Sequence, residues 1–218
     1  MKITLNADMG ESFGPWRMGH DDELLPLIQA ANLACGYHAG DPVVMRAAVR
    51  AAMAAGVEIG AHPGFPDLQG FGRRPMTLSP AEVETMVLYQ IGALDGIARA
   101  EGVRVTHVKA HGMLSNMAAA DDALADAIAA AVRGYGRDLI LMGTTCTALV
   151  RAGERAGLRV AHEVFADRAH MDDGSLMPRS QPGAMIHVAE QAVAQILRFL
   201  DAGGIVGPSG KVLKTPID

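Results

Sequence analysis

Short apolar segments alternate with helix-forming segments along almost the whole chain, and this alternation restricts the fold more than any other feature of the sequence. Repetition of strand, helix and strand is typical of a mostly parallel sheet with helices packed against it. The expected strands are Ile3–Ala7, Ala31–Ala34, Val57–Ala61, Val103–Lys109, Leu139–Gly143 and Val160–Phe165.

The segments between the strands carry the usual marks of helix ends. Asp41 followed by proline predicts a helix start, and Gly56 predicts its end. Ser79, Pro80 and Glu82 form a capping box for a second helix. The expected helices are 41–56, 79–102, 121–134, 145–157 and 189–200. Two irregular segments, 63–75 and 167–182, are rich in glycine, proline and charge and are expected to cover the mouth of a site.

A closed barrel suits this pattern better than an open sheet. A dinucleotide-binding sheet would show G-x-G-x-x-G after an early strand, and this motif and the phosphate-binding G-x-x-x-x-G-K-[ST] motif are both missing from the sequence. Polar residues follow several strands and do not gather at one crevice, as expected for a barrel with chemistry at its carboxyl-terminal end. The 218 residues, half of them hydrophobic, are enough for one domain.

Composition excludes several classes of function. The net charge of −5, without a basic stripe, argues against nucleic acid as the main partner. No segment approaches the ~18 uninterrupted apolar residues of a membrane span, and the N-terminus has no signal-peptide pattern. The two cysteines cannot make a disulfide framework, so we expect a cytoplasmic protein with packed thiols.

Polar residues follow several expected strands, and barrel geometry would bring them to one mouth. Asp8 and Glu11 follow the first strand, His38 the second, His62 the third, and His111 the fourth. A lone histidine at a strand end is more often a structural group, but the coincidence over four strands favours a shared site. Asp8, His62 and His111 are therefore the predicted ligands of a divalent metal such as zinc, with an open position for a nucleophilic water.

Carboxylates and a lysine near these ligands suit acid–base chemistry. Glu11 or Asp41 is the candidate general base, although a helix-capping role alone explains Asp41. Lys109, which alternates with His107 and His111 on one side of its strand, is expected to steady an oxyanion or bind a carboxylate or phosphate. The predicted catalytic set is Asp8, Glu11, His38, Asp41 and Lys109.

Arg73 and Arg74 lie side by side in a glycine-rich segment, which suits an anionic group such as a carboxylate or phosphate. The alternative is an ordinary solvated loop. The predicted substrate-binding residues are Asn6, Asn32, Arg73, Arg74, Asp167 and Arg168.

Five stretches of the chain together resemble the LamB/YcsF family. They read LNADMGESFG, ANLACGYHAGDP, IGAHPGFPDLQGFGRR, HVKAHGMLSN and EVFADRAHMDDGSLMPR, and they cover nearly the whole chain in order. The resemblance implies an α/β fold similar to the glycoside hydrolase/deacetylase barrels, a distorted (β/α) barrel of about seven mostly parallel strands. It also implies ATP-dependent hydrolysis of 5-oxoproline (pyroglutamate) to glutamate, with ATP as co-substrate, by a complex with two further subunits, B and C.

The sequence departs from the pattern of this family near the predicted site. Ala110, Met113 and Ser115 replace a proline, an alanine and a tyrosine of the family, and His170 stands where tyrosine is usual. Family members usually continue into a strand carrying Cys-Val-His-Gly-Asp and a final helix. Residues 1–218 are thus expected to form one barrel domain without this closing element, either as a piece of a longer chain or with another chain on the exposed sheet edge.

Two other functions fit the same residues. One is a stand-alone metal-dependent deacetylase or amidohydrolase acting on a sugar or a small amide, which would work without ATP. The other is a non-catalytic subunit that binds substrate within a complex. The sequence leaves the metal and the oligomeric state open, including a possible homo-oligomer.

Overall fold

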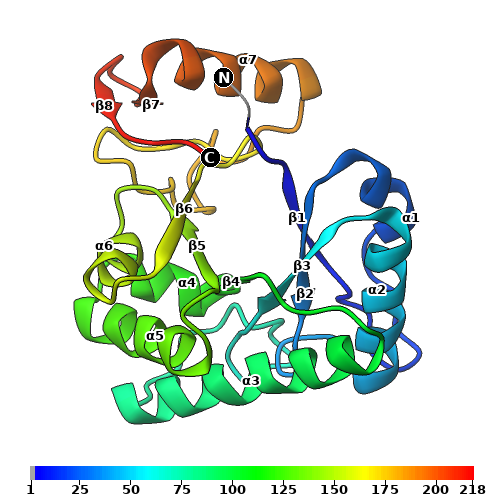
Figure 1. The fold of residues 1–218 in the computed structure, drawn as a ribbon. Helices are drawn as coiled ribbons and strands as arrows, with labels where there is room; N and C mark the ends of the chain where they lie inside the picture. The colour runs from blue at the N-terminus through cyan, green and yellow to red at the C-terminus, as the bar shows by residue number, and fades with distance from the viewer. Residues whose placement is uncertain (1–2) are drawn as a thin grey trace.

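The computed structural model describes residues 3–218 and centres on a curved sheet of six parallel strands (Figure 1). The strands are neighbours in the order in which they occur along the chain, so the sheet curls as part of a barrel. This confirms the expected α/β, barrel-like fold. The six strands are β1 Asn6–Met9, β2 Ala30–Ala34, β3 Glu58–His62, β4 His107–Lys109, β5 Ile140–Thr144 and β6 Arg159–Glu163.

Helices cover the outer face of this sheet (Figure 1). Apolar side chains on the outer face, such as Leu33, Ile59 and Val108, belong to one buried core that the helices share. The helices are α1 Asp21–Leu24, the 3-10 helix η1 Leu25–Leu27, α2 Pro42–Ala55, α3 Pro80–Ala100, α4 Gly112–Ala118, α5 Asp122–Tyr135, α6 Ala148–Arg155 and α7 Ala189–Ala202.

A second, smaller unit of structure follows β6. Here α7 packs with an antiparallel pair, β7 Gly204–Val206 and β8 Val212–Lys214, around a small core that contains Phe199, Ile205 and Ile217. The irregular segment between β6 and α7 lies between this unit and the main sheet (Figure 1). No helix in the described part of the chain is long and apolar enough to cross a membrane.

Local sequence signals account for most element ends. Asp41 caps α2 by accepting hydrogen bonds from the backbone of Val43 and Val44 at 2.8 and 3.0 Å. The capping box predicted at Ser79 and Glu82 is present at the start of α3. The expected boundaries differ most at β4, which is only three residues long, and at α6, which begins at Ala148 because residues 145–147 form a turn in which Cys146 has a positive φ of 66°.

The inner face of the sheet is polar, which follows from the two-residue alternation of strands. Aligned inward positions on neighbouring strands include Asp8, Asn32 and Gly60, which are register partners in turn. A cavity of about 310 Å³ also lies inside the curved sheet, and its walls include Asn6, His107 and Glu163 together with the apolar Ile140 and Met142 of β5. Several strands therefore hold polar side chains on the inner face of a rigid frame.

Candidate active site

Lys109, at the end of β4, is a buried cation with three oxygen partners. Its Nζ lies 2.6 Å from Glu163 Oε1, 3.1 Å from Asp8 Oδ1 and 3.1 Å from Asn6 Oδ1. Burial alone would lower the pKa of Lys109, but the two carboxylates raise it above its usual range. Lys109 is therefore charged, and it holds together the ends of β1, β4 and β6.

Asp8 and His62 form the second pair of the site. Asp8 Oδ2 lies 3.3 Å from His62 Nε2. Burial raises the pKa of Asp8, but the charges of His62 and Lys109 outweigh this and hold it well below its usual value. Burial lowers the pKa of His62, and Asp8 reverses this to a net rise. The side chain of Asp8 keeps 37% of its surface exposed, unlike that of Lys109, so Asp8 is the member of this network that faces the mouth.

Asn32 and His107 fix the orientation of Asp8 from within the sheet. Asn32 Nδ2 donates to Asp8 Oδ1 at 2.9 Å, and Asn32 Oδ1 accepts from His107 Nε2 at 3.0 Å. The His107 ring reaches Asn32 across Gly60, where a Cβ atom would collide with the ring. Burial, together with the charges of Lys109 and His62, lowers the pKa of His107 to about 4. His107 is thus a neutral positioning residue.

Three histidines and a glutamate gather beside Asp8. Ligand atoms of Glu11, His38, His62 and His111 all lie within 4.8 Å of one another. Glu11 Oε1 is 3.1 Å from His38 Nε2 and 3.5 Å from His111 Nδ1, and the rings of His38 and His111 stack with centroids 3.6 Å apart. Burial raises the pKa of Glu11. Burial and the charge of His62 lower the pKa of His38 to about 2 and that of His111 to about 3, so both rings are neutral.

The ring nitrogens of this cluster are oriented as in metal-binding histidines. His62 Nδ1 lies 2.7 Å from the carbonyl oxygen of Lys109, and His111 Nε2 lies 2.8 Å from that of Phe71, so each of these nitrogens donates. The other nitrogens, His62 Nε2 and His111 Nδ1, then face each other at 3.0 Å. Asp8 raises the pKa of His62 and so favours a proton on His62 Nε2; a bound cation would replace that proton and bridge the two facing nitrogens. Histidine ligands usually donate their second N–H to a carbonyl or carboxylate, so the cluster fits a divalent cation.

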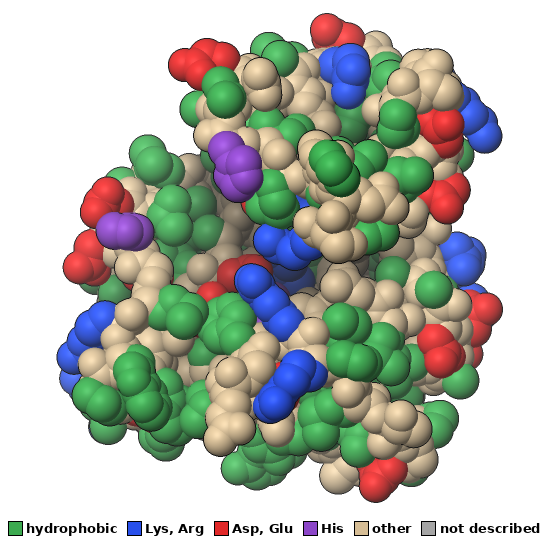
Figure 2. Space-filling view, turned by 180° about the vertical axis from the view of Figure 1, so that it is seen from behind, with side chains coloured by type: hydrophobic (Ala, Val, Ile, Leu, Met, Phe, Trp, Pro, Cys, Tyr) green, Lys and Arg blue, Asp and Glu red, His purple; other side chains and the backbone are tan. Residues whose placement is uncertain are grey.

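The predicted metal set overlaps this cluster at His62 and His111. Asp8, the third predicted ligand, lies beside His62 but is held by Asn32 and Lys109, while Glu11 and His38 complete the group. The structure thus brings together most of the predicted catalytic residues. A hollow that holds both basic and acidic side chains opens on one face of the molecule (Figure 2).

The remaining predicted residues are spread around this centre. Asp41 is engaged in capping α2 and accepts from the Gly14 N–H at 2.7 Å. Arg74 pairs with Asp67 inside its own loop. Arg73 lies over the ring of Phe71, with its guanidinium carbon 5.1 Å from the ring centroid.

Asp167 and Arg168, the last two predicted residues, follow β6 and differ in environment. Asp167 is exposed, whereas Arg168 is buried and donates from Nη2 to the Met177 carbonyl oxygen at 2.8 Å. Glu163 is absent from the predicted set although it is a direct partner of Lys109. Its position at the end of β6 is visible in the sequence, but nothing there indicates that it pairs with Lys109.

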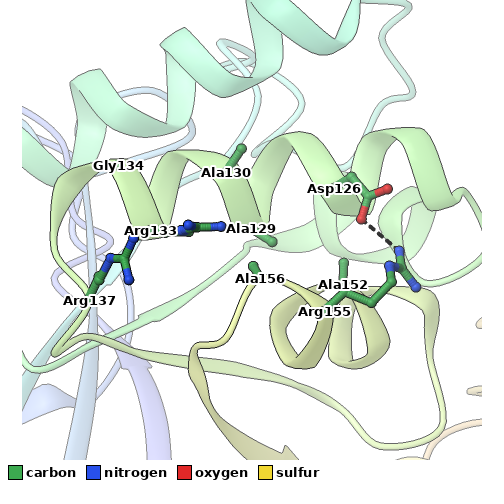
Figure 3. A pocket seen from close by; sticks show the side chains of 9 residues that line it. All are labelled: Asp126, Ala129, Ala130, Arg133, Gly134, Arg137, Ala152, Arg155 and Ala156. Atoms are coloured by element: carbon green, nitrogen blue, oxygen red, sulfur yellow. Dashed lines mark hydrogen bonds and ion pairs between the residues drawn. The ribbon is translucent and has the colours of Figure 1, made fainter.

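A larger hollow of about 520 Å³ lies on the outside of the molecule between α5 and α6 (Figure 3). Its floor is made of alanine and glycine, and Arg155 at its rim pairs with Asp126 at 2.6 Å. The described residues that line it include none of the predicted site residues. The chemistry of this chain therefore points to the carboxyl ends of the strands.

Comparison with known proteins gives a consistent result over almost the whole chain. The model of the LamB/YcsF family matches residues 3–218. The A subunit of 5-oxoprolinase from Azoarcus sp. (strain BH72) is 61% identical over 215 residues, which are 99% of this chain and 84% of that protein. The corresponding A subunit from Methylococcus capsulatus (Bath) is 56% identical over 216 residues, 99% of this chain and 83% of the relative.

A solved structure has the same fold. The crystal structure of the lactam utilization protein from Thermus thermophilus superposes with a TM-score of 0.95 at 48% sequence identity, covering 100% of this chain and 88% of that one. The family model and these relatives lead to one conclusion: the chain belongs to the LamB/YcsF family.

Proposed function

We propose that this chain is one subunit of an ATP-dependent 5-oxoprolinase, a hydrolase that opens the cyclic amide of 5-oxo-L-proline to give L-glutamate while ATP is cleaved to ADP and phosphate. The observation that carries the proposal is the Asp8–Lys109–Glu163 ion-pair network beside Glu11, in a chain 61% identical to the A subunit of a 5-oxoprolinase. In the proposed complex, subunits B and C are the partners. The free thiols suit the reducing cytoplasm.

The geometry assigns different roles to the charged groups. All three N–H donors of Lys109 have oxygen partners, so we assign it the role of a counter-ion to Asp8 and Glu163, and its charge helps to lower the pKa of Asp8. Asp8 is the exposed carboxylate and is assigned to orient the lactam or its attacking water. Glu11, whose pKa is raised by burial, is better suited than Asp8 to accept a proton near neutral pH.

The reaction assigned to these groups is the hydrolysis of one amide bond. A water oxygen bonds to the ring carbonyl carbon and loses its proton to Glu11. The bond between that carbon and the ring nitrogen then breaks, and the nitrogen takes up a proton as the amine of glutamate. Transfer of the γ-phosphoryl group of ATP to the amide oxygen would release ADP and make the ring carbon more electrophilic. After the C–N bond breaks, a second water would hydrolyse the resulting acyl phosphate, so that glutamate and inorganic phosphate are released.

The test is turnover by the reconstituted complex. The chain is mixed with subunits B and C of a 5-oxoprolinase, and the release of glutamate and ADP is measured. Glutamate release is expected to fall at least about 100-fold in Asp8→Asn and Glu11→Gln, which is the lower range for removing a positioned acid or base. Asp126→Asn, a matched change on the outer surface, is the control. Unchanged rates in both site variants would show that these roles are wrong.

The cluster of Glu11, His38, His62 and His111 favours a second candidate function, a metal-dependent amidohydrolase or deacetylase that needs no ATP. These four residues would hold the cation, which would act as a Lewis acid and lower the pKa of a bound water. Elemental analysis of the purified chain, with His62→Gln as control, measures the metal. Stoichiometric metal and amide hydrolysis without ATP would favour this function, whereas strict ATP dependence of glutamate release would favour the first.

A further inference from the structure

Arg168 is a buried cation without a counter-ion. Only 7% of its surface is exposed, yet its guanidinium makes a single hydrogen bond, from Nη2 to the Met177 carbonyl oxygen. Its Nε is buried and has no hydrogen-bond partner. Among residues 3–218, no carboxylate forms an ion pair with this guanidinium. Buried charges in proteins are normally paired, because an unpaired charge out of water is costly.

The surroundings of Arg168 increase this imbalance. Burial lowers its pKa, and so do the charges of Arg179 and Arg73, while the exposed Asp167 opposes them only in part. Neither Arg73 nor Arg179 has an ion-pair partner within the described chain. Three arginines therefore share one region with two carboxylates, the exposed Asp167 and Glu11, whose pKa burial raises and the charge of Arg73 lowers in part, so the region keeps an excess of positive charge that suits an anion.

Arg168 is held firmly at the same end of the sheet as the active site. It lies five residues beyond the end of β6, where Glu163 pairs with Lys109. Gln195 Nε2 on α7 lies 2.8 to 3.2 Å from the carbonyl oxygens of Phe165, Ala166 and Arg168 and fixes this turn. The ring of Phe165 in turn lies 5.2 Å from Lys109 Nζ.

Arg73 approaches the same region from the loop that follows β3. It packs on Phe71, whose carbonyl oxygen binds His111 and whose ring contacts His38 and His111. The hollow that Figure 2 shows contains basic side chains beside acidic ones. The histidine–glutamate cluster and the Lys109 network thus lie between two loops that each contribute an arginine.

We propose that Arg168, assisted by Arg73, binds the carboxylate of the substrate, so that the site accepts anionic lactams and discriminates against neutral ones. The planar guanidinium suits a carboxylate, and its only hydrogen bond among the described residues, from Nη2, leaves Nε and Nη1 available as donors. Phosphate sites commonly use a helix N-terminus, and no helix begins between β6 and α7, a segment that the structure describes throughout. This inference rests on the proposed function and specifies which part of the substrate the site recognises.

The experiment compares two lactams in the reconstituted complex, 5-oxoproline and 2-pyrrolidinone, which has the same ring without the carboxylate. Arg168→Met is expected to raise KM for 5-oxoproline about 10- to 100-fold, the value of a hydrogen bond to a charged group, with kcat changed little. The KM and kcat for 2-pyrrolidinone are expected to be the same in Arg168→Met as in the wild type. Arg168→Lys keeps the positive charge but loses the planar guanidinium, so its KM for 5-oxoproline should lie between those of the wild type and Arg168→Met. Arg73→Met should raise this KM less than Arg168→Met does. Arg137→Gln, a change of an exposed arginine at the outer hollow, is the matched control.

The thermal unfolding of the free chain separates binding from a structural role. Removing an unpaired buried charge should leave Arg168→Met as stable as the wild type, or more stable. A variant that fails to fold would overturn the inference, because Arg168 would then be structural. Equal losses for both lactams, an unchanged KM, or a change confined to the KM for ATP, which would indicate a phosphate site, would each overturn it too. If the wild-type complex does not turn over 5-oxoproline at all, the proposed function itself fails.

Discussion

Lys109 and Arg168 are two buried cations at the same end of the sheet, and their surroundings are opposite. Lys109, on β4, is held by two carboxylates and an amide oxygen. Arg168, in the loop after β6, is held by one carbonyl oxygen and has an unpartnered Nε. In the strand region the charge of Lys109 is balanced by carboxylates of the protein itself. In the loop region the charge of Arg168 has no carboxylate partner among the described residues, so a bound anion would balance it.

This difference suggests a division of work within the site. Groups that must keep a fixed protonation state are placed on strands and neutralised by each other, which preorganises the field at the reacting bond. The group that recognises the anion is placed on a loop, where an unsatisfied charge is available to the ligand. Each of the following substitutions alters one residue of the strand region or of the loop region, so that the two roles can be compared.

The largest effect is expected from Lys109→Met. The change leaves the carboxylates of Asp8 and Glu163 without their shared cation, and breaking a buried pair typically costs about 3–5 kcal/mol of unfolding free energy. Urea denaturation measures this cost, and turnover should fall with it because the pKa of Asp8 rises. Lys211→Met on the exposed surface is the control. Equal stability of the two variants would mean that Lys109 is not the counter-ion assigned above.

A smaller effect is expected from Gln195→Leu, which loosens the Arg168 loop without touching the strand region. The carbonyl oxygens that Gln195 now binds would lose their donor, which costs about 1–3 kcal/mol for a buried group. KM for 5-oxoproline should rise while kcat stays close to the wild-type value. Gln191→Leu, at an exposed position near the start of α7, should change neither. A loss of kcat with unchanged KM would contradict the separate roles of strand and loop.

Sequence patterns predicted the part of the site that depends on strand periodicity. Inward alternation at the ends of successive strands places Asp8, Asn32, His62 and Lys109 together, as their spacing indicated. The alternation of apolar segments and capped helices likewise predicted the parallel sheet. These features are local, because one turn of helix or one step of strand decides where a side chain points.

Other features depend on contacts that no local pattern records. Arg73 and Arg74 are adjacent, yet one packs on Phe71 and the other binds Asp67, because their loop folds back on itself. The sequence around Asp41 fits both a helix-capping residue and a general base. In the structure its side chain caps the start of α2. The short strands β7 and β8 are not evident in the sequence because three residues show too little alternation.

His107→Gln tests how firmly the strand region holds its charges. The pKa of His107 is lowered from 6.5 to about 4, so between these values the unfolded chain binds a proton that the folded chain does not. Stability from this group is therefore present above pH 6.5 and lost as the pH falls towards 4. Removing the imidazole should flatten the pH dependence of the unfolding free energy by at most about 1.4 kcal/mol per pH unit.

Chemical denaturation at several values between about pH 7 and 5, within the range where the imidazole of an unfolded chain titrates, measures this slope. The exposed His20, changed to glutamine, serves as the control and should leave the slope as it is in the wild type. An identical slope in His107→Gln would show that the His107 site accepts a proton in the folded protein. In that case Lys109 would not exert the field that the strand region is assigned.

The smallest effect is expected from Arg74→Gln, and it sharpens the contrast within a single loop. The guanidinium of Arg74 is exposed, whereas its partner Asp67 is buried, so the change should lower the stability of the loop while its effect on substrate binding stays the smallest of the series. Asp67 would still accept from the Gly70 N–H at 3.0 Å, so the loop should keep its shape. KM for 5-oxoproline should stay within about twofold of the wild-type value, because the change removes no hydrogen bond to the substrate, and losing a hydrogen bond to a charged group would have a larger effect. Because Arg73 is its direct neighbour, a rise in KM for Arg74→Gln as large as that for Arg168→Met would mean that overall positive charge, and not the placement of Arg168, attracts the substrate.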